Sequence, residues 1–113
     1  MNIQIFGTKK DFETKKAQRY FQERKIKFQF VDLKEKGLSK GEFTSVKQAV
    51  GSLDALIDAQ AKDQKAVALL KYLTPESQEA KLLENQQILQ TPIVRNGKQA
   101  TVGYCPDVWK NWE

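Results

Sequence analysis

The apolar and polar positions in the first third of the chain follow two different periods. Asn2–Phe6 is a short apolar run with alternating isoleucines, which predicts a buried strand that ends at Gly7. From Asp11 to near Lys25, apolar residues recur at helical spacing among lysines and arginines, which predicts a helix. Phe28–Leu33 alternates again and predicts a second strand. Two strands joined by a helix form a parallel, right-handed unit.

The middle of the chain is predicted to be helical. Ser39 followed three residues later by Glu42 is a capping box, so a helix is expected to begin there and to run to about Val50. Two short helical stretches are expected next, over Asp54–Ala59 and Asp63–Leu73. A threonine–proline pair at 74–75 then marks the start of another helix, which ends near residue 84. We therefore expect a helical insertion over about residues 39–86.

The closing section returns to strand patterns. Thr91–Arg95 and Gln99–Val102 flank an Asn-Gly pair, which predicts a β-hairpin. A short terminal helix is expected to open at Cys105 and to carry Trp109 and Trp112 into the core. This order of elements predicts an α/β, thioredoxin-like fold, in which helices flank a mixed four-stranded sheet. We expect residues 1–113 to form one such domain.

The composition excludes several kinds of chemistry. The chain has no histidine and one cysteine, so Ser-His-Asp catalysis, Cys-His catalysis and His/Cys zinc sites are excluded within it, and no metal site is expected. Neither GxGxxG nor a Walker lysine loop occurs. No apolar run approaches the roughly 20 residues that span a bilayer, and the early Lys9 and Lys10 argue against a signal peptide. A single cysteine cannot form an internal disulfide, so a cytoplasmic location is expected.

The positive charge is placed unevenly along the chain. Residues 1–50 hold twelve Lys/Arg against six Asp/Glu, whereas residues 51–113 hold seven against eight. The basic excess around the first helix is typical of a solvated helix face, or else of a surface that contacts an acidic partner or nucleic acid. No pattern of stacking aromatic residues accompanies it, so direct nucleic-acid binding is not expected.

The start of the first helix is the first candidate site. An apolar strand ends at Gly7, a loop follows, and the helix begins at Asp11. Free backbone N–H groups at a helix start form a ready site for an anion. Asp11 is a good cap for that helix and brings its own negative charge to the site.

Five short motifs follow one another in an order that extends over almost the whole chain. They are Ile5-Phe6-Gly7, Thr14-Lys15-Lys16-Ala17, Thr91-Pro92-Ile93-Val94, Asn96-Gly97-Lys98 and Val102-Gly103-Tyr104. Together they resemble the arsenate-reductase-like family, which includes glutaredoxin-coupled arsenate reductases and the Spx-type transcription regulators. The resemblance implies the thioredoxin-like fold with its helical insertion. It also implies a cis bond before Pro92, at an edge that receives an extended peptide or glutathione in related folds.

The chain departs from this family at the residues that carry its chemistry. Where the family has a nucleophilic cysteine, this chain has Asp11, which cannot cycle between thiol and disulfide states. The three arginines that hold the oxyanion in arsenate reductases correspond to Asp58, Thr91 and Cys105. None of these side chains is basic. The resemblance therefore implies that this chain is not an active arsenate reductase.

Four neighbours of Asp11 are candidate ligand-binding residues. Thr91 and Pro92 are expected to lie beside the first helix, where the proline can also serve only to shape the loop. Lys10 can neutralise the cap or help to hold an anion. Phe12 can line the mouth of a pocket, although core packing is the expected role for an aromatic residue at this position.

Two functions from different classes follow. The favoured hypothesis is a binding or regulatory module without redox activity, for which the Spx-type regulators, which bind RNA polymerase, set a precedent. The alternative is a glutathione-linked thiol–disulfide oxidoreductase that uses Cys105 through a mixed disulfide, whereas the simpler interpretation of Cys105 is a packing residue. A third possibility is that Asp11 replaces a cysteine or selenocysteine. No cofactor is expected other than glutathione, and the expected partner is a protein or glutathione.

Overall fold

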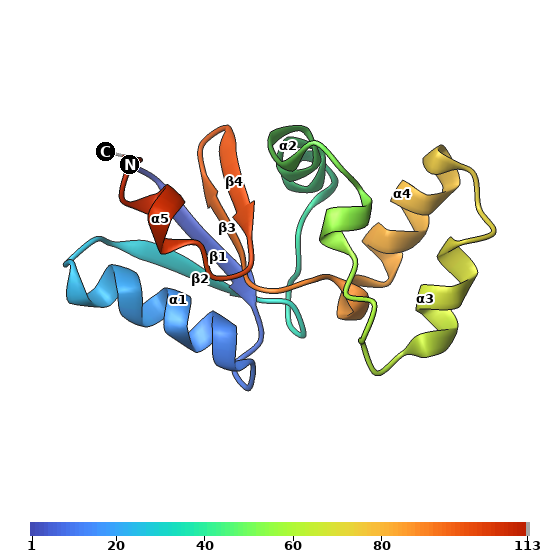
Figure 1. Cartoon of the computed structure of the whole chain (residues 1–113), viewed down its shortest axis with the longest axis horizontal. Helices are drawn as coiled ribbons and strands as arrows, with labels where there is room; N and C mark the ends of the chain where they lie inside the picture. The colour runs from blue at the N-terminus through green and yellow to red at the C-terminus, as the bar shows by residue number, and fades with distance from the viewer. Residues whose placement is uncertain (113) are drawn as a thin grey trace.

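The centre of the protein is a mixed four-stranded sheet with the order β2-β1-β3-β4 (Figure 1). The computed structural model describes residues 1–112. The strands are β1 (Ile3–Gly7), β2 (Phe28–Asp32), β3 (Ile93–Asn96) and β4 (Gln99–Val102). β1 pairs in parallel with β2 and antiparallel with β3, and β3 pairs antiparallel with β4. The predicted parallel unit and the predicted hairpin are therefore both confirmed.

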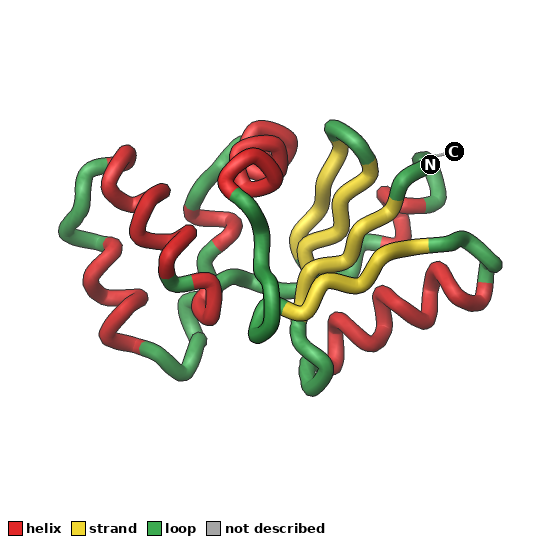
Figure 2. Tube along the Cα trace, turned by 180° about the vertical axis from the view of Figure 1, so that it is seen from behind, coloured by secondary structure: helices red, strands yellow, loops and turns green. Residues whose placement is uncertain are grey.

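Helices cover both faces of this sheet. They are α1 (Phe12–Glu23), α2 (Lys40–Val50), α3 (Gln64–Leu70), α4 (Pro75–Glu84) and α5 (Pro106–Trp109), with single 3₁₀ turns at η1 (Asp54–Leu56) and η2 (Gln86–Ile88). Figure 1 shows α1 and α5 on one side of the sheet and α2 on the other. The described residues measure 43 × 26 × 23 Å, and Figure 2 shows α3 and α4 extending the molecule away from the sheet.

Local capping signals fix most of the helix boundaries. Ser39 and Glu42 form the predicted capping box of α2, and Gly51 ends that helix in the left-handed conformation with φ +86°. The Thr74 side chain accepts a hydrogen bond from the Ser77 N–H, and Pro75 stands at the first position of α4 as predicted. These caps satisfy backbone groups within their own turn, which explains why the sequence reveals them.

Three of the expected helical segments are shorter in the structure, and one of them, expected over Asp63–Leu73, is helical over Gln64–Leu70. Only Asp54–Leu56 of the expected stretch 54–59 is helical, because Ile57 instead forms an isolated β-bridge with Leu89. The terminal helix ends at Trp109, and Trp112 lies beyond it while still being buried as expected. A pairing partner more than thirty residues away therefore overrides the local helical pattern after residue 56.

Two buried clusters share the sheet between them. Ile5 and Val94 belong to the cluster under α1 and α5, which also holds Phe21 and Trp109. Phe6 belongs to the cluster under α2 and the rest of the insertion. Successive strand residues point to opposite faces, so neighbouring residues of β1 serve different clusters. No helix in residues 1–112 is long and apolar enough to cross a membrane.

Candidate functional site

The candidate site begins where β1 meets α1. Asp11 is the N-cap residue of α1, and its Oδ2 atom accepts hydrogen bonds from the Thr14 N–H at 3.2 Å and the Thr14 hydroxyl at 2.6 Å. The carboxylate thus accepts the hydrogen bond of the Thr14 N–H, a donor that could otherwise bind an external anion at this turn. The structure places Asp11 where the sequence predicted it, at the leading end of the first helix.

Thr14 is held in place by a close approach to β1. Its side chain is fully buried, and it packs directly against the backbone of Gly7. A Cβ atom added at Gly7 would lie 2.6 Å from the Thr14 Cγ2 atom, closer than side chains tolerate. Gly7 therefore serves to let α1 sit tightly on the end of β1, and this contact fixes the donor that holds Asp11.

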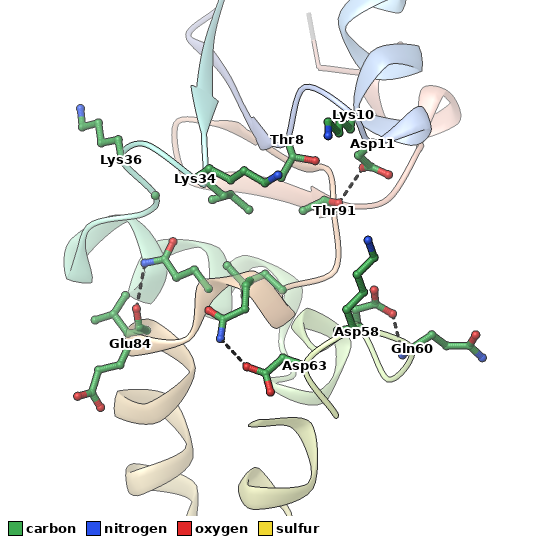
Figure 3. Close-up of a pocket in the computed structure, with 18 residues that line it drawn as sticks. Thr8, Lys10, Asp11, Lys34, Lys36, Asp58, Gln60, Asp63, Glu84 and Thr91 are labelled. Carbon is green, nitrogen blue, oxygen red and sulfur yellow. Dashed lines mark hydrogen bonds between the residues drawn. The ribbon is translucent and has the colours of Figure 1, made fainter. Parts of the chain in front are cut away.

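Thr91 joins the site from the far end of the sequence. Its hydroxyl donates a 2.7 Å hydrogen bond to the same Oδ2 atom of Asp11, across 80 positions of the chain (Figure 3). The Thr91–Pro92 peptide bond is cis, as the resemblance implied. Within residues 1–112, neither the N–H nor the C=O of Thr91 takes part in a backbone hydrogen bond. One carboxylate oxygen thus ties the start of α1 to the loop before β3, and the backbone groups of Thr91 in that loop stay available.

A groove of about 820 Å³ opens in front of Asp11 and Thr91. One wall comes from the loops around β1 and β2, and the other comes from the insertion (Figure 3). Its lining residues include four lysines and four carboxylates, so the two signs of charge are equal in number around it. They are Lys10, Lys34, Lys36, Lys62, Asp11, Asp58, Asp63 and Glu84. This balance differs from that of a site for a small oxyanion, in which positive charge would dominate.

Hydrogen bonds within the insertion hold two of these carboxylates. Asp58 Oδ1 accepts from the Gln60 N–H at 2.9 Å, which fixes the turn after the β-bridge. The Gln87 amide and the Ala66 N–H lower the pKa of Asp63 by donating to its carboxylate. Asp58 stands where the resemblance placed an oxyanion-binding arginine, so the groove has a carboxyl group at this position in place of a cation.

The other predicted ligand-binding residues lie in different places. Lys10 lines the groove beside Asp11. Pro92 is buried and does not line the groove. Phe12 also lies outside the groove lining, and the expectation that it packs in the core is wrong, since the residue is 70% exposed. The buried face of α1 is set by Thr14, Ala17, Tyr20 and Phe21, so the first helical position turns to solvent.

Cys105 packs away from the groove. It lies against the cluster under α1 and α5, and its thiol donates to the Val102 carbonyl at 3.3 Å. Burial raises the pKa of the Cys105 thiol, against a smaller opposing effect of the Thr101 side chain. Cys105 precedes α5 as predicted, but its side chain makes no capping hydrogen bond, and α5 has only four residues. The interpretation as a half-buried packing residue is confirmed.

Gln86 also lines the groove, and the sequence did not predict its role. The Gln86 side chain accepts from the Leu38 N–H at 2.8 Å and donates to the Leu38 carbonyl at 2.9 Å and the Leu83 carbonyl at 3.1 Å. Gly37 stands directly beside this amide with φ +75°. The glycine was the available signal, since a left-handed residue between a strand and a capped helix marks a close approach. Its partner 49 positions later gave no local signal.

The sheet, the cis-proline loop and the capped start of α1 together define a thioredoxin-like fold of the arsenate-reductase type. No protein-family model matches the sequence, and no curated protein gives a significant sequence match. Among solved structures, an ArsC family related protein from Bacteroides fragilis superposes with a TM-score of 0.86 at 19% identity, over 100% of this chain and 98% of that chain.

Two further structures support the same fold. The arsenate reductase from Vibrio cholerae has a TM-score of 0.81 at 21% identity, over 96% of this chain and 94% of that one. The glutaredoxin-like protein NrdH-redoxin from Escherichia coli has a TM-score of 0.52 at 16% identity, over 100% of this chain and 96% of that one. The structural neighbours are therefore ArsC family arsenate reductases and related proteins, and the predicted thioredoxin-like fold is confirmed. At these identities the likeness concerns the fold.

Proposed function

We propose that this protein is an arsenate-reductase-like binding module that works without thiol chemistry and holds an extended polypeptide in its groove. The observation that carries the proposal is the state of Asp11. Its Oδ2 atom already accepts three hydrogen bonds, from the Thr14 N–H, the Thr14 hydroxyl and the Thr91 hydroxyl. A carboxylate held in this way acts as a structural cap, and it has no sulfur with which to attack a substrate.

The absence of a usable thiol supports the same proposal. The chain has one cysteine, and that thiol is half-buried, donates to a backbone carbonyl and has a raised pKa. Nucleophilic cysteines need the opposite environment, with exposure and positive charge or a helix start that stabilises the thiolate. Cys105 also does not line the groove, so it is badly placed to form a mixed disulfide with a ligand bound beside Asp11.

The free backbone of Thr91 suggests how a polypeptide would bind. The N–H and C=O groups of this residue have no backbone partner in residues 1–112, and they stand at the groove beside Asp11. An extended peptide can pair with such groups as an added strand, in which main-chain bonds give the affinity and side-chain contacts give the specificity. The balanced charges of the groove fit a ligand that carries both signs, as a peptide does.

The proposal is tested by paired activity and binding measurements. Arsenate and disulfide reduction with glutathione are expected to be the same for the native protein and for Cys105→Ser, at the level of the buffer. Nuclear magnetic resonance with a set of capped hexapeptides is expected to shift the amides of Thr91 and Lys10. A matched peptide, methylated on the nitrogen that faces Thr91, is expected to bind less tightly.

Two results would overturn the proposal. Reductase activity that disappears in Cys105→Ser would assign thiol chemistry to this protein. Peptide-induced shifts confined to surfaces outside the groove, or equal affinity for the methylated peptide, would remove Thr91 from the binding site. An Asp11→Cys variant is a useful reference, because a thiol at the helix start is expected to acquire a lowered pKa.

A further inference from the structure

The net positive charge of this protein belongs to one helix and its flanks. Residues 9–27 hold eight Lys/Arg and three Asp/Glu, whereas the remainder of the chain holds eleven of each. The whole formal charge of +5 is therefore concentrated on α1 and its ends. A charge placed on one element in this way creates a directional field, which can steer a partner of opposite sign to that surface.

The outward face of α1 combines this charge with an exposed aromatic ring. Phe12, Lys15 and Arg19 are spaced three and four residues apart, so they lie along one face of the helix, and all three are exposed. Phe12 is 70% exposed. Among the residues that the structure describes, neither Lys15 nor Arg19 forms an ion pair. Both cations are therefore available to an incoming group.

A second aromatic residue extends the same surface toward α5. The Lys16 Nζ atom lies 4.2 Å from the centre of the Tyr104 ring and 5.7 Å from the centre of the Phe12 ring. Tyr104 in turn stands edge-on to the buried Trp109, with ring centres 5.4 Å apart. Lys16 thus connects two partly exposed rings, one of which rests on the core. We call these five residues, Phe12, Lys15, Lys16, Arg19 and Tyr104, the α1 patch.

From the α1 patch we infer a docking surface for an acidic polypeptide segment that carries an apolar side chain. Carboxylates of the segment meet Lys15 and Arg19, and its apolar side chain packs against Phe12. Interfaces between proteins are enriched in aromatic residues and arginine, and charge complementarity raises their association rates. No residue of the α1 patch lines the groove, so this surface is distinct from the one proposed above.

The same contacts argue against a nucleic acid as the occupant. Single-stranded nucleic acids bind by stacking their bases on open aromatic faces. Here the Lys16 ammonium lies 4.2 Å from the centre of the Tyr104 ring, so Phe12 is the one ring of the α1 patch left for a base, whereas single-stranded nucleic acids stack successive bases on several rings. An acidic side chain instead gains favourable contacts with Lys15 and Arg19, whereas Lys16 already pairs with Glu13, with 3.7 Å between Nζ and Oε2.

The test uses two synthetic dodecapeptides of matched length. One peptide contains glutamates and a central pair of leucines. The other has the same sequence with glutamine in place of every glutamate. Nuclear magnetic resonance of the full chain is expected to show shifts on the α1 patch with the acidic peptide alone. The affinity, measured by fluorescence anisotropy, is expected to fall steeply from low to high salt.

Matched variants separate this surface from general charge attraction. The double variant Lys15→Glu/Arg19→Glu is expected to weaken the acidic peptide about tenfold or more, since two attractions become repulsions. Phe12→Ser is expected to weaken it severalfold, because the apolar anchor is lost. The control Lys65→Glu/Lys98→Glu makes the same change in net charge at two other exposed lysines and is expected to have a small effect. Circular dichroism verifies that each variant is folded.

Three outcomes would overturn the inference. The first is an acidic peptide that shifts no amide of the α1 patch. The second is a control variant that loses as much affinity as Lys15→Glu/Arg19→Glu, which would reduce the effect to net charge. The third is a single-stranded oligonucleotide or a phosphatidylserine vesicle that binds the patch more tightly than the acidic peptide, which would assign the surface to that class of partner.

Discussion

Asp11 shows how one side chain can change what a helix start does. In a reductase of this fold the turn stabilises a thiolate, whereas here one carboxylate oxygen takes up the Thr14 N–H and two hydroxyl donors. The donors that would serve a reactive group serve the native structure instead. The expected consequence is a contribution of Asp11 to stability rather than to turnover.

This contribution is measurable by substitution. Asp11→Ala removes the cap of α1 and leaves the buried Thr14 hydroxyl without its acceptor. We expect the free energy of unfolding to fall by about 1–2 kcal/mol. Asp107→Ala, which removes a carboxylate from the first turn of α5, is expected to change it by about 0.5 kcal/mol or less. Urea titration compares the two, and similar losses would contradict a special role for Asp11.

The Cys105 thiol is expected to be unreactive near neutral pH. Because burial raises its pKa, the proton leaves only when the pH exceeds the ordinary thiol value of about 8.5. The folded state binds this proton more tightly, so the stability from the neutral thiol is present below the unfolded pKa and is lost as the pH rises through the folded pKa.

Alkylation of Cys105 by iodoacetamide, followed against pH, tests this expectation. The reaction is expected to be slow at neutral pH and to accelerate only in alkaline solution. The matched control is the double variant Val108→Cys/Cys105→Ser, in which the native thiol is removed and a new thiol stands at an exposed position. Faster reaction of the native thiol than of this control at neutral pH would contradict the burial argument.

At the scale of the element, the capping box of α2 connects to the sheet. Glu42 binds the Ser39 N–H and also accepts from the Gln4 side chain, which contacts Arg95. Burial on its own would raise the pKa of Glu42, but these hydrogen bonds and the nearby positive charge of Arg95 outweigh it and lower the pKa. The start of α2 is thereby tied to β1 and β3 through a group that titrates in acid.

The sign of the resulting pH dependence follows from the lowered pKa. Ionised Glu42 stabilises the fold above the unfolded value of about 4.3, and this contribution is lost as the pH falls through the lower folded value. Glu42→Gln is therefore expected to be less stable than the native protein at neutral pH and to approach it in acid. Thermal melts across the acid range measure the difference, and a gap that widens toward low pH would contradict this assignment.

Predictability also differs from element to element. The caps at Asp11, Ser39 and Thr74 were predicted because each satisfies backbone groups within three residues of itself. The segment after Leu56 was predicted as helix and is not, because Ile57 pairs with the distant Leu89. Phe12 was assigned to the core from its residue type, whereas its position on the helix decides its exposure. The sequence thus predicted interactions within one helical turn, but it did not predict contacts between distant segments.

At the scale of the whole molecule, the Gln86 side chain joins the loop after β2 to the end of the insertion. Gln86 makes three hydrogen bonds to backbone atoms of Leu38 and Leu83, at the point where the loop from β2 meets the end of α4. The neighbouring Gln87 is exposed, and its side chain donates hydrogen bonds to the side chains of Asp63 and Asn85. The two adjacent glutamines therefore offer a matched pair.

Gln86→Ala is expected to lower the free energy of unfolding by about 1–3 kcal/mol, because two backbone groups of the buried Leu38 lose their partner. Gln87→Ala is expected to cost much less. Hydrogen exchange is expected to show faster exchange of the Leu38 amide in the Gln86→Ala variant only. Equal exchange in both variants would mean that solvent already satisfies these groups.

The candidate site as a whole was only half predictable. Asp11 came from the pattern of a strand, a loop and a capped helix, and Thr91 came from a resemblance in motif order; the structure brings the two together. The facing wall of the groove comes from the insertion, where Asp63 and Gln87 meet through a side-chain contact across 24 positions. No periodicity or motif marks such a contact, since its partners are set by how the helices pack.

Adjacent residues of the central strands pack against opposite layers of the molecule. Ile5 faces the layer of α1, and Phe6 beside it faces the layer of α2, with Val94 and Ile93 dividing in the same way. A slip of β1 by a single residue would exchange the occupants of both layers at once and draw Gly7 away from Thr14. The register of β1 that packs apolar side chains on both faces of the sheet is therefore also the register that places Thr14 beside Asp11.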